Sequence, residues 1–292
     1  MAATILDSKG WKVNGVYRGR WTLLSDTASA ATDGITTEAG TINTLTGDDN
    51  LIGRLTSGTG SAVAPIAGVF INASTTLNLG FGDDRVTGYG PTANSYEYGI
   101  RNEGVLNTGY GNDRLEGTGN DGIFNAASAQ ISTGDGNDRI TGIGVSFGIV
   151  NRGVISMDAG RDSLIGSNSA LGIFNTGVIQ MGDGADTVDA LVGSAPGGFS
   201  GPGGLIDLGR GNDLLKGFGE GTFRGGDGTD TLILQDGTYH IIAVGNDFQI
   251  TADEAPGITM TVNSMELFGG INTASYTALG AGNFIIDGGV IT

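Results

Sequence analysis

The sequence predicts an all-β fold, a parallel β-helix or β-roll solenoid with about seven to eight coils of roughly 24 residues each. Two observations lead to this prediction. A Gly-x-Gly-x-Asp motif recurs along most of the chain, and a second repeated segment precedes its copies. Glycine also accounts for 56 of the 292 residues, with only five prolines and no collagen-like period of three. We therefore expect the glycines to form the recurring tight turns of a solenoid.

The first repeated element is the Gly-x-Gly-x-Asp motif, which continues with a large apolar residue and a further glycine. Clear copies start at Gly80, Gly109, Gly134 and Gly209, and four variants extend the series. The fixed aspartates of the eight copies are Asp49, Asp84, Asp113, Asp138, Asp162, Asp186, Asp213 and Asp230. Consecutive members lie 35, 29, 25, 24, 24, 27 and 17 residues apart, so the central period is about 24. A period of this length is typical of a solenoid that adds one coil per repeat.

The second repeated element lies upstream of the aspartate loops. Its copies are GITTEAGTI from Gly34, GIRNEGVL from Gly99, GIFNAASAQI from Gly122, GIVNRGVI from Gly148 and GIFNTGVI from Gly172. Together the two elements predict three short strands per coil, with Ile, Leu and Val at the inward positions. Four amides occupy equivalent places in these copies, namely Asn102, Asn125, Asn151 and Asn175. We expect them to stack at one turn and to hydrogen-bond from coil to coil.

The limits of the repeats divide the chain into three regions. Residues 1–33 break the pattern and form a predicted N-terminal cap, residues 34–236 hold the solenoid repeats, and residues 237–292 form a predicted C-terminal β cap with a tail. The N-terminal region carries the basic residues Lys9, Lys12, Arg18 and Arg20, whereas no Lys or Arg follows Arg224. Opposite charges at the two ends predict head-to-tail self-association.

The repeated loops have the composition of calcium sites. Glycines let the backbone turn several carbonyl oxygens toward one point, and the aspartate adds a charged ligand. Calcium accepts six to eight such oxygens, whereas magnesium demands a stricter octahedron. The predicted metal ligands are the eight fixed aspartates and the loop glycines Gly80, Gly82, Gly109, Gly111, Gly134, Gly136, Gly182, Gly184, Gly209, Gly211, Gly226 and Gly228. We expect calcium binding and folding to be one coupled event.

The charge balance fits this expectation. The chain has 31 acidic and 14 basic residues and a net charge of −17. One divalent ion in each of eight loops would add +16 and leave about −1. Ordinary acidic solubility is the alternative explanation of the same composition. Either way, the negative charge disfavours nucleic acid and anionic membranes as partners.

Other features bound the function. The chain has no cysteine, which excludes disulfides and thiolate chemistry. No stretch is apolar and long enough to cross a bilayer, and the N-terminus lacks the pattern of a secretory signal peptide. The single histidine, His240, is expected to be a structural residue of the cap, and acidic pairs such as Asp83 and Asp84 recur as loop elements. We therefore expect no catalytic site and no organic cofactor.

The repeats resemble those of the RTX proteins, whose Gly-Gly-x-Gly-x-Asp nonapeptides form calcium-loaded parallel β-rolls. The segment GGDGTDTLI from Gly225 matches that pattern in full, and the copies from Gly80 through Gly209 keep its Gly-x-Gly-x-Asp core. The likeness covers roughly residues 34–236. It implies an extracellular or cell-surface protein, secreted through a type I exporter without an N-terminal signal peptide, with residues 271–292 as the export signal.

RTX proteins include toxins, proteases, adhesins and surface-layer components, and this chain has room only for repeats and two caps. The leading prediction is a structural protein of a bacterial extracellular layer, sheath or filament that folds, and assembles head to tail, on binding calcium. The alternative is a monomeric adhesin or polysaccharide-binding module, and a polysaccharide-active enzyme comes third. Arg85, Arg114 and Arg139 follow three of the aspartates and are expected either to grip acidic sugars or to pair with neighbouring acids.

Overall fold

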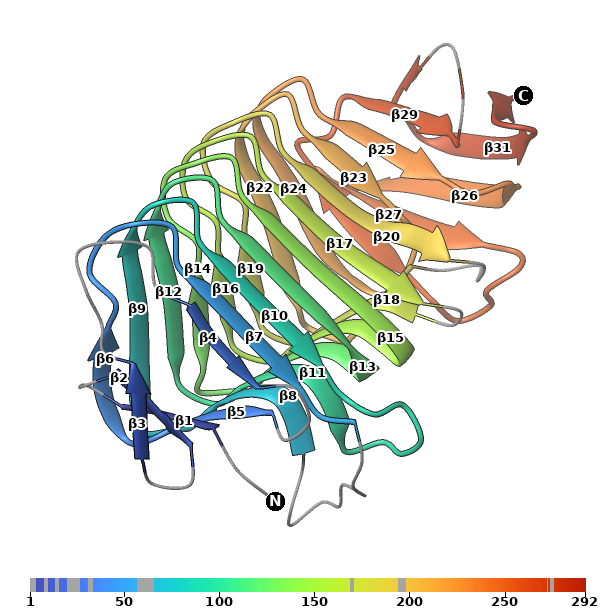
Figure 1. The fold of residues 1–292 in the computed structure, drawn as a ribbon. Coiled ribbons are helices and arrows are strands. Elements are labelled where there is room, and N and C mark those ends of the chain that lie inside the picture. The colour runs from blue at the N-terminus through green and yellow to red at the C-terminus, as the bar shows by residue number, and fades with distance from the viewer. Residues whose placement is uncertain are drawn as a thin grey trace.

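The computed structural model describes residues 4–7, 10–13, 16–19, 27–30, 34–56, 66–168, 171–193, 198–271, 273 and 276–292, and side chains only from residue 34 onward. The described chain is all-β, and its strands form parallel sheets in stacked coils, as a β-solenoid requires (Figure 1). Most coils pass in turn through three columns of strands, which we name column C, column A and column B. In the short coil from Asp213 to Asp230 an isolated bridge at Gly219 replaces the column B strand. The predicted all-β class and parallel sheets are confirmed.

The three columns are defined by their parallel pairings. Column C contains β6 (Gly40–Asn43), β9 (Thr75–Phe81), β12 (Val105–Tyr110), β14 (Gln130–Ser132), β16 (Val154–Ser156), β19 (Val178–Gln180), β22 (Leu205–Gly211), β24 (Gly221–Gly228) and β28 (Met260–Asn263). Column A contains β4 (Thr27–Ala30), β7 (Asn50–Arg54), β10 (Arg85–Tyr89), the first parts of β13 (Arg114–Asn125) and β15 (Arg139–Asn151), β17 (Ser163–Asn168), β20 (Thr187–Gly193), β23 (Leu214–Lys216), β25 (Thr231–Leu234) and β29 (Leu267–Gly270). Column B contains β1 (Thr4–Asp7), β5 (Ile35–Thr37), β8 (Ile66–Ile71), β11 (Glu97–Asn102), the second parts of β13 and β15, β18 (Leu171–Asn175) and β21 (Phe199–Ser200).

Equivalent residues of successive repeats lie above one another. In column A the strand pairing aligns one apolar residue per coil, and each of these side chains is 0% exposed. The aligned residues are Leu51, Val86, Leu115, Ile140, Leu164, Val188, Leu215 and Leu232. Because every coil contributes a buried apolar residue at the same place, the core continues along the solenoid axis.

Columns A and B meet at a seam of glycines. A methyl group added to Gly117 of column A would lie 2.2 Å from the carbonyl oxygen of Gly122 in column B, and one added to Gly142 would lie 2.1 Å from that of Gly148. The same close approach joins Gly88 to Gly99 and Gly166 to Gly172. The glycines that open the second repeated element are equally constrained, because a methyl group on Gly122 would lie 2.3 Å from the backbone nitrogen of Ile143.

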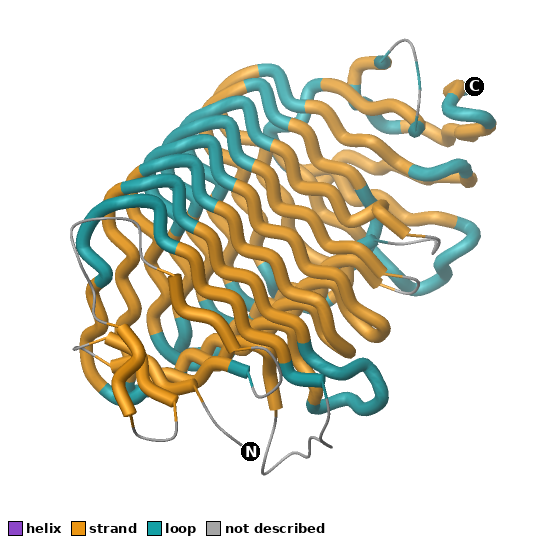
Figure 2. The backbone as a smooth tube through the Cα atoms, viewed as in Figure 1, coloured by secondary structure: helices purple, strands orange, loops and turns teal. Residues whose placement is uncertain are grey.

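The three corners of a coil, named after the columns they join, differ in regularity. The BC corner holds the predicted asparagine ladder, which is confirmed: Nδ2 of Asn102 donates to Oδ1 of Asn125 at 2.9 Å, and the contact repeats at 2.8 and 2.9 Å through Asn151 to Asn175. The CA corner holds the aspartate loops, which stack along one edge of the molecule as the teal turns of Figure 2. The AB corner takes up the variation in repeat length.

Coils much longer than the central period of 24 residues carry most of their extra residues at the AB corner. The steps between stacked aspartates are 35, 29 and 27 residues where the column A strand and the following column B strand are separated by residues 55–65, 90–96 and 194–198. Where the step is 24 or 25, β13 and β15 run through the corner without a break. Insertions thus accumulate on one side of the solenoid.

Antiparallel strands adjoin the parallel stack at both ends. At the start of the chain, β2 (Gly10–Val13) and β3 (Val16–Gly19) pair with each other, and β2 pairs with β1. At the other end, β27 (Asp247–Ala252), β26 (Gly237–Val244), β31 (Gly282–Asp287) and β32 (Val290–Ile291) extend column C, and β30 (Thr277–Ala278) pairs with β29. Of the basic residues predicted to charge the N-terminal cap, Lys9 and Arg20 lie outside the described residues, as do the side chains of Lys12 and Arg18. The capping roles of both regions stay predictions.

Candidate functional site

The eight aspartates singled out by the repeat lie in one column at the CA corner, each directly before a column A strand. We call this set the aspartate column. All eight side chains are buried, with exposed fractions between 0% and 2%. Sequence spacing alone therefore identified residues that the fold brings together from coils up to 35 residues apart.

In the seven aspartates that follow Asp49, one carboxylate oxygen binds the neighbouring coil. The backbone N–H of Asp84 donates to Oδ1 of Asp113 at 2.7 Å, and that of Asp113 donates to Oδ1 of Asp138 at 2.8 Å. The same contact continues from Asp49 through Asp230 at 2.7 to 2.9 Å, and Oε2 of Glu266 receives the last N–H. Because N–H donors satisfy the Oδ1 atoms, the column fastens one coil to the next.

The residue before each aspartate forms a second, exposed column that bonds in the opposite direction. The N–H of Asn112 donates back to Oδ1 of Asp83 at 2.7 Å, and the N–H of Asn137 donates to Oδ1 of Asn112 at 3.0 Å. Consecutive N–H groups of these loops therefore point to opposite neighbours, and the second column is interrupted where Arg161 and Ala185 supply no acceptor oxygen. These loops are thus hydrogen-bonded to the coils on both sides.

The second carboxylate oxygen has no comparable partner. Within the described residues, seven Oδ2 atoms are buried and accept no hydrogen bond, namely those of Asp84, Asp113, Asp138, Asp162, Asp186, Asp213 and Asp230. An asparagine at these positions would make the same Oδ1 contact without leaving a charged acceptor inside the protein. A buried, unsatisfied carboxylate oxygen needs a proton or a cation.

Burial dominates the titration of the column. It raises the pKa of Asp84, Asp162 and Asp213 from 3.8 to about 7, and that of Asp138 and Asp230 to about 6. The pKa values of Asp113 and Asp186 are also raised by burial. Hydrogen bonds from neighbouring N–H groups lower these pKa values but do not outweigh the loss of water. The ionised column is therefore unfavourable without a compensating positive charge.

The predicted glycines shape the loop around these carboxylates. All of them except Gly184 have φ between 84° and 155°, a range that side chains rarely adopt. A methyl group on Gly136 would lie 1.6 Å from the carbonyl oxygen of Gly111 in the neighbouring coil. The two degraded copies have a non-glycine residue at the first glycine position of the motif, and its φ is still positive. Leu45 has φ 86° where the next copy has Gly80, and Asp158 has φ 61° where the next copy has Gly182.

The donor set fits a hard divalent cation held between coils. Adjacent aspartates supply one buried carboxylate from each of two coils, and the loop backbone supplies carbonyl oxygens. Within the described residues no three or more His, Asp or Glu side chains gather as a metal cluster, so backbone carbonyls would complete any coordination shell. This composition suits calcium better than zinc, and the metal role of these residues stays a prediction.

The arginines that follow the aspartates form a row on the outer surface. Strand pairing places Arg85, Arg114 and Arg139 side by side in three successive coils. Arg85 pairs with Glu116 at 2.9 Å, which supports the structural alternative for that residue. Arg114 and Arg139 are exposed and have no acidic partner within 4 Å among the described residues, so both explanations remain open for them.

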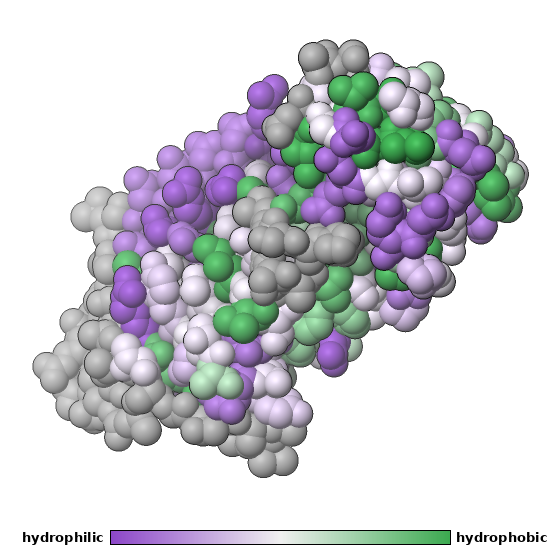
Figure 3. Space-filling view, turned by 90° about the vertical axis from the view of Figure 1, so that its right-hand side faces the viewer, coloured by the Kyte–Doolittle hydropathy of each residue, from purple (hydrophilic) through white to green (hydrophobic). Residues whose placement is uncertain are grey.

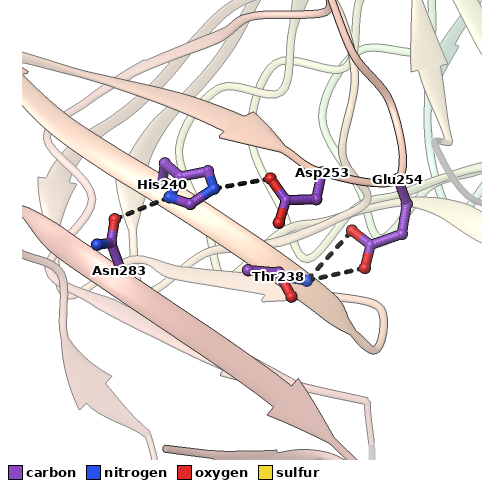
Figure 4. Close-up of polar contacts among 5 residues, drawn as sticks. All are labelled: Thr238, His240, Asp253, Glu254 and Asn283. Atoms are coloured by element: carbon purple, nitrogen blue, oxygen red, sulfur yellow. Dashed lines mark hydrogen bonds and ion pairs between the residues drawn. The ribbon is translucent and has the colours of Figure 1, made fainter.

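His240 bridges three parts of the C-terminal region (Figure 4). Its Nδ1 lies 2.8 Å from Oδ1 of Asn283 on β31, and its Nε2 lies 2.8 Å from Oδ1 of Asp253, which follows β27. These contacts with Asn283 and Asp253 raise the pKa of His240. Only the imidazolium donates through both nitrogens, so the ring is a structural clamp between strands, in keeping with the role expected from the sequence.

The repeat analysis missed one cluster of residues at the AB corner. A groove there is lined by aromatic side chains and by a single carboxylate, that of Asp121. The signal that was available is the 29-residue step from Asp84 to Asp113, which exceeds the period and inserts residues beside this groove.

Comparison with known proteins adds no family assignment. No protein-family model matches the sequence, and no curated protein shows significant similarity to it. The resemblance to RTX proteins therefore rests on the repeat motifs alone. In the part of the chain that the structure describes, no helix has the length and apolar character needed to span a membrane.

Proposed function

We propose that this protein is a calcium-binding β-solenoid with a structural role outside the cell, as part of a layer, sheath or filament. The observation that carries the proposal is the aspartate column, in which buried Oδ2 atoms without hydrogen-bond partners recur once per coil. In this proposal calcium is the counter-charge that lets the column ionise, and folding follows its binding.

The size of the electrostatic effect supports a coupled event. Each unit of raised pKa corresponds to about 1.4 kcal/mol between the two protonation states. Several carboxyls with pKa values near 6 or 7 against an ordinary 3.8 thus oppose folding at neutral pH by an amount comparable with the roughly 5–15 kcal/mol that stabilises a domain. With a bound cation, the ionised carboxylates would stabilise the folded state and no longer oppose folding.

A structural role is favoured over catalysis by the way the polar residues are used. The aspartates fasten coil to coil, and both ring nitrogens of His240 are engaged by Asn283 and Asp253. Head-to-tail assembly is part of the proposal because, among the described residues, β6 and β32 each pair with a neighbouring strand on one side only, and an unpaired strand edge can accept a further strand. Export without a signal peptide follows only from the resemblance to RTX proteins.

The second candidate function is a monomeric adhesin or polysaccharide-binding module. The groove at the AB corner favours it, because aromatic side chains and a carboxylate line a hollow that the repeat does not require. In this alternative the calcium-loaded solenoid is a rigid support and not a unit of assembly.

Sedimentation velocity during a titration from excess chelator to millimolar calcium tests both candidates. Compaction of an expanded chain followed by growth into large species supports the structural assembly. Compaction to a monomer that stays monomeric favours the binding module. An unchanged sedimentation coefficient from chelator to millimolar calcium would show that the calcium proposal is wrong. A parallel titration with magnesium tests the selectivity expected of a carbonyl-rich site.

A further inference from the structure

The groove at the AB corner lies on the outer face of column B. Its floor is a small apolar cluster separate from the solenoid core, which includes Tyr98 and Phe124 with ring centroids 5.1 Å apart. Phe147 and Phe174, with centroids 5.6 Å apart, continue the aromatic lining. The hollow measures about 240 Å³. Figure 3 views this side of the molecule and shows apolar residues in green among pale and purple ones.

Polar groups interrupt this aromatic surface, namely one carboxylate, that of Asp121, and the side chains of Arg152, Asn120, Ser95 and Ser146. Strand pairing places Asp121 between Tyr98 in one neighbouring coil and Phe147 in the other. The next member of the same row is Leu171. Asp121 is only 8% exposed and lines the groove. Its carboxylate has no hydrogen-bond partner among the described residues, and the charge of Arg152, which also lines the groove, offsets its burial only in part. A nine-tenths buried carboxylate without a hydrogen-bond partner is costly, and the repeat does not account for it.

The wall of the groove is built by the insertion of the 29-residue repeat. Residues 91–97 leave the repeat pattern here, and the buried carboxylate of Glu97 fixes their shape. It accepts hydrogen bonds from the N–H of Ala93 at 2.7 Å, from the N–H of Asn94 at 2.9 Å and from the side chain of Asn94 at 2.7 Å. This turn presents Tyr96, 41% exposed, at the groove. The aromatic rim is thus held in place without a ligand.

We propose that the AB groove binds one neutral sugar residue of a glycan, with the apolar face of the ring against the aromatic lining and a hydroxyl group donating to Asp121. The proposal rests on the second candidate function and names the ligand class of its site, and the groove and the aspartate column lie at different corners of the coil.

The chemistry of the groove selects this class of ligand. A wholly apolar ligand would leave Asp121 buried without a partner. A cation would approach Arg101 and Arg152, whose guanidinium groups lie 4.7 and 5.5 Å from the ring centroid of Phe124. An anion would approach the carboxylate of Asp121. A pyranose ring avoids these conflicts, since it offers C–H groups to aromatic faces and hydroxyl donors to a carboxylate.

The volume sets the number of sugar units. Pockets for larger ligands measure roughly 300–1,000 Å³, and this groove of about 240 Å³ is smaller. One ring fits, and the remainder of a chain would extend into solvent. The proposal is therefore recognition of a terminal or single internal residue and not of an extended chain.

The test is a glycan array that carries neutral and uronic oligosaccharides, probed with the full chain folded in calcium, followed by calorimetric titration with the best-retained glycan. Three proteins are compared: the wild type, Asp121→Leu and Tyr96→Ala. Asp121→Leu copies the residue that Leu171 supplies in the same row, so it is expected to fold. Loss of a hydrogen bond to a charged group should weaken binding at least about tenfold.

The control is Tyr276→Ala, which removes an equally exposed tyrosine, at 48%, outside the groove. It should bind like the wild type. Circular dichroism of each protein shows whether it is folded, which separates failure of this proposal from failure of calcium-dependent folding. Absence of neutral glycan binding by the folded wild type would overturn the proposal. So would unchanged binding by folded Asp121→Leu, or retention of uronic glycans only.

Discussion

The CA and AB corners flank the same column of strands, yet one is nearly invariant and the other varies from coil to coil. At the CA corner the backbones of adjacent loops touch, so that a methyl group on Gly136 or Gly160 would lie within 1.6 Å of a neighbouring carbonyl oxygen. At the AB corner β13 and β15 run through as paired strands, whereas the coil before them carries residues 90–96 as an insertion between its two strands. A repeat is therefore kept where coils contact atom against atom, and individual features arise where they do not.

The largest expected difference between the corners concerns pH, because the buried carboxylates of the repeat lie in the aspartate column. Folding raises the pKa values of Asp84, Asp162 and Asp213 from 3.8 to about 7. Their stabilising contribution is therefore fully present below about pH 4 and is lost as the pH rises through about 6 to 7. Metal-free protein should be several kcal/mol more stable near pH 5 than near pH 8, as measured by urea denaturation in metal-free buffer.

Calcium should reverse this trend. Calcium binds the ionised carboxylates, so the stabilisation it brings should grow between about pH 5 and pH 8. Urea midpoints measured in millimolar calcium at both pH values provide the control. A metal-free protein that is equally stable at both pH values would show that the Oδ2 atoms are not the electrostatic burden inferred from their burial.

The second prediction tests the steric demand of the CA corner. Gly136→Ala should destabilise the protein by about 3 kcal/mol or more, because the new methyl group meets the carbonyl oxygen of Gly111 at 1.6 Å and the residue has φ 155°. Gly280→Ala is the matched control, since its methyl group would meet no atom within 4 Å. Thermal denaturation in calcium measures both. Similar melting temperatures for the two variants would contradict the tight stacking of the loops.

The third prediction separates the two oxygens of one aspartate. Asp138→Asn keeps the Oδ1 that accepts the N–H of Asp113 but replaces the unpaired Oδ2 by an amide nitrogen. Without metal near pH 8 the variant should be at least as stable as the wild type. In calcium it should lose about 3 kcal/mol of the ligand-dependent stabilisation. The measurement is the urea midpoint with and without calcium.

Asp135→Asn is the control for this substitution, because Asp135 is exposed and stands outside the aspartate column. Its calcium response should match that of the wild type. Equal losses in the two variants would mean that surface charge, and not the register of the column, governs calcium binding.

The sequence predicted the stacking of residues at the CA and BC corners but did not predict the groove at the AB corner. Asp138 and Asn125 recur at fixed positions, so spacing alone predicted that each would stack on its equivalents. The groove depends on a break in alternation: Gly122 faces column A at the seam, the adjacent Ile123 is in the core, and Asp121 is left on the outer face. No single-strand pattern predicts such a bend, because it arises from the approach of two columns.

The aromatic character of the groove was hidden for the same reason. Phe124 stands between Ile123 and Asn125 in the second repeated element, where a core position would be an equally good interpretation. Its direct neighbours across the coils are Arg101 and Val150, so aromatic residues do not occupy this position in every coil. A search for repeats finds only positions that are the same in every coil. A specific binding site depends on residues that differ between coils, so such a search misses it.

The smallest expected effect comes from loosening the AB corner alone. Glu97→Gln keeps one acceptor oxygen but loses the charge-assisted hydrogen bonds that hold Ala93 and Asn94, so stability should fall by about 1–2 kcal/mol. Glu116→Gln breaks the partly exposed pair with Arg85 and should change stability by about 0.5 kcal/mol or less. Urea denaturation in calcium measures both variants.

The decisive readout of this comparison is the calcium response. Because Glu97 shapes a loop that projects from the solenoid, its loss should weaken glycan binding in the AB groove while the calcium dependence of folding stays unchanged. A change in calcium response would couple the two corners through column A and would contradict their independence. An unchanged calcium response with weakened binding would establish that the repeat supplies the scaffold and the insertion supplies the recognition.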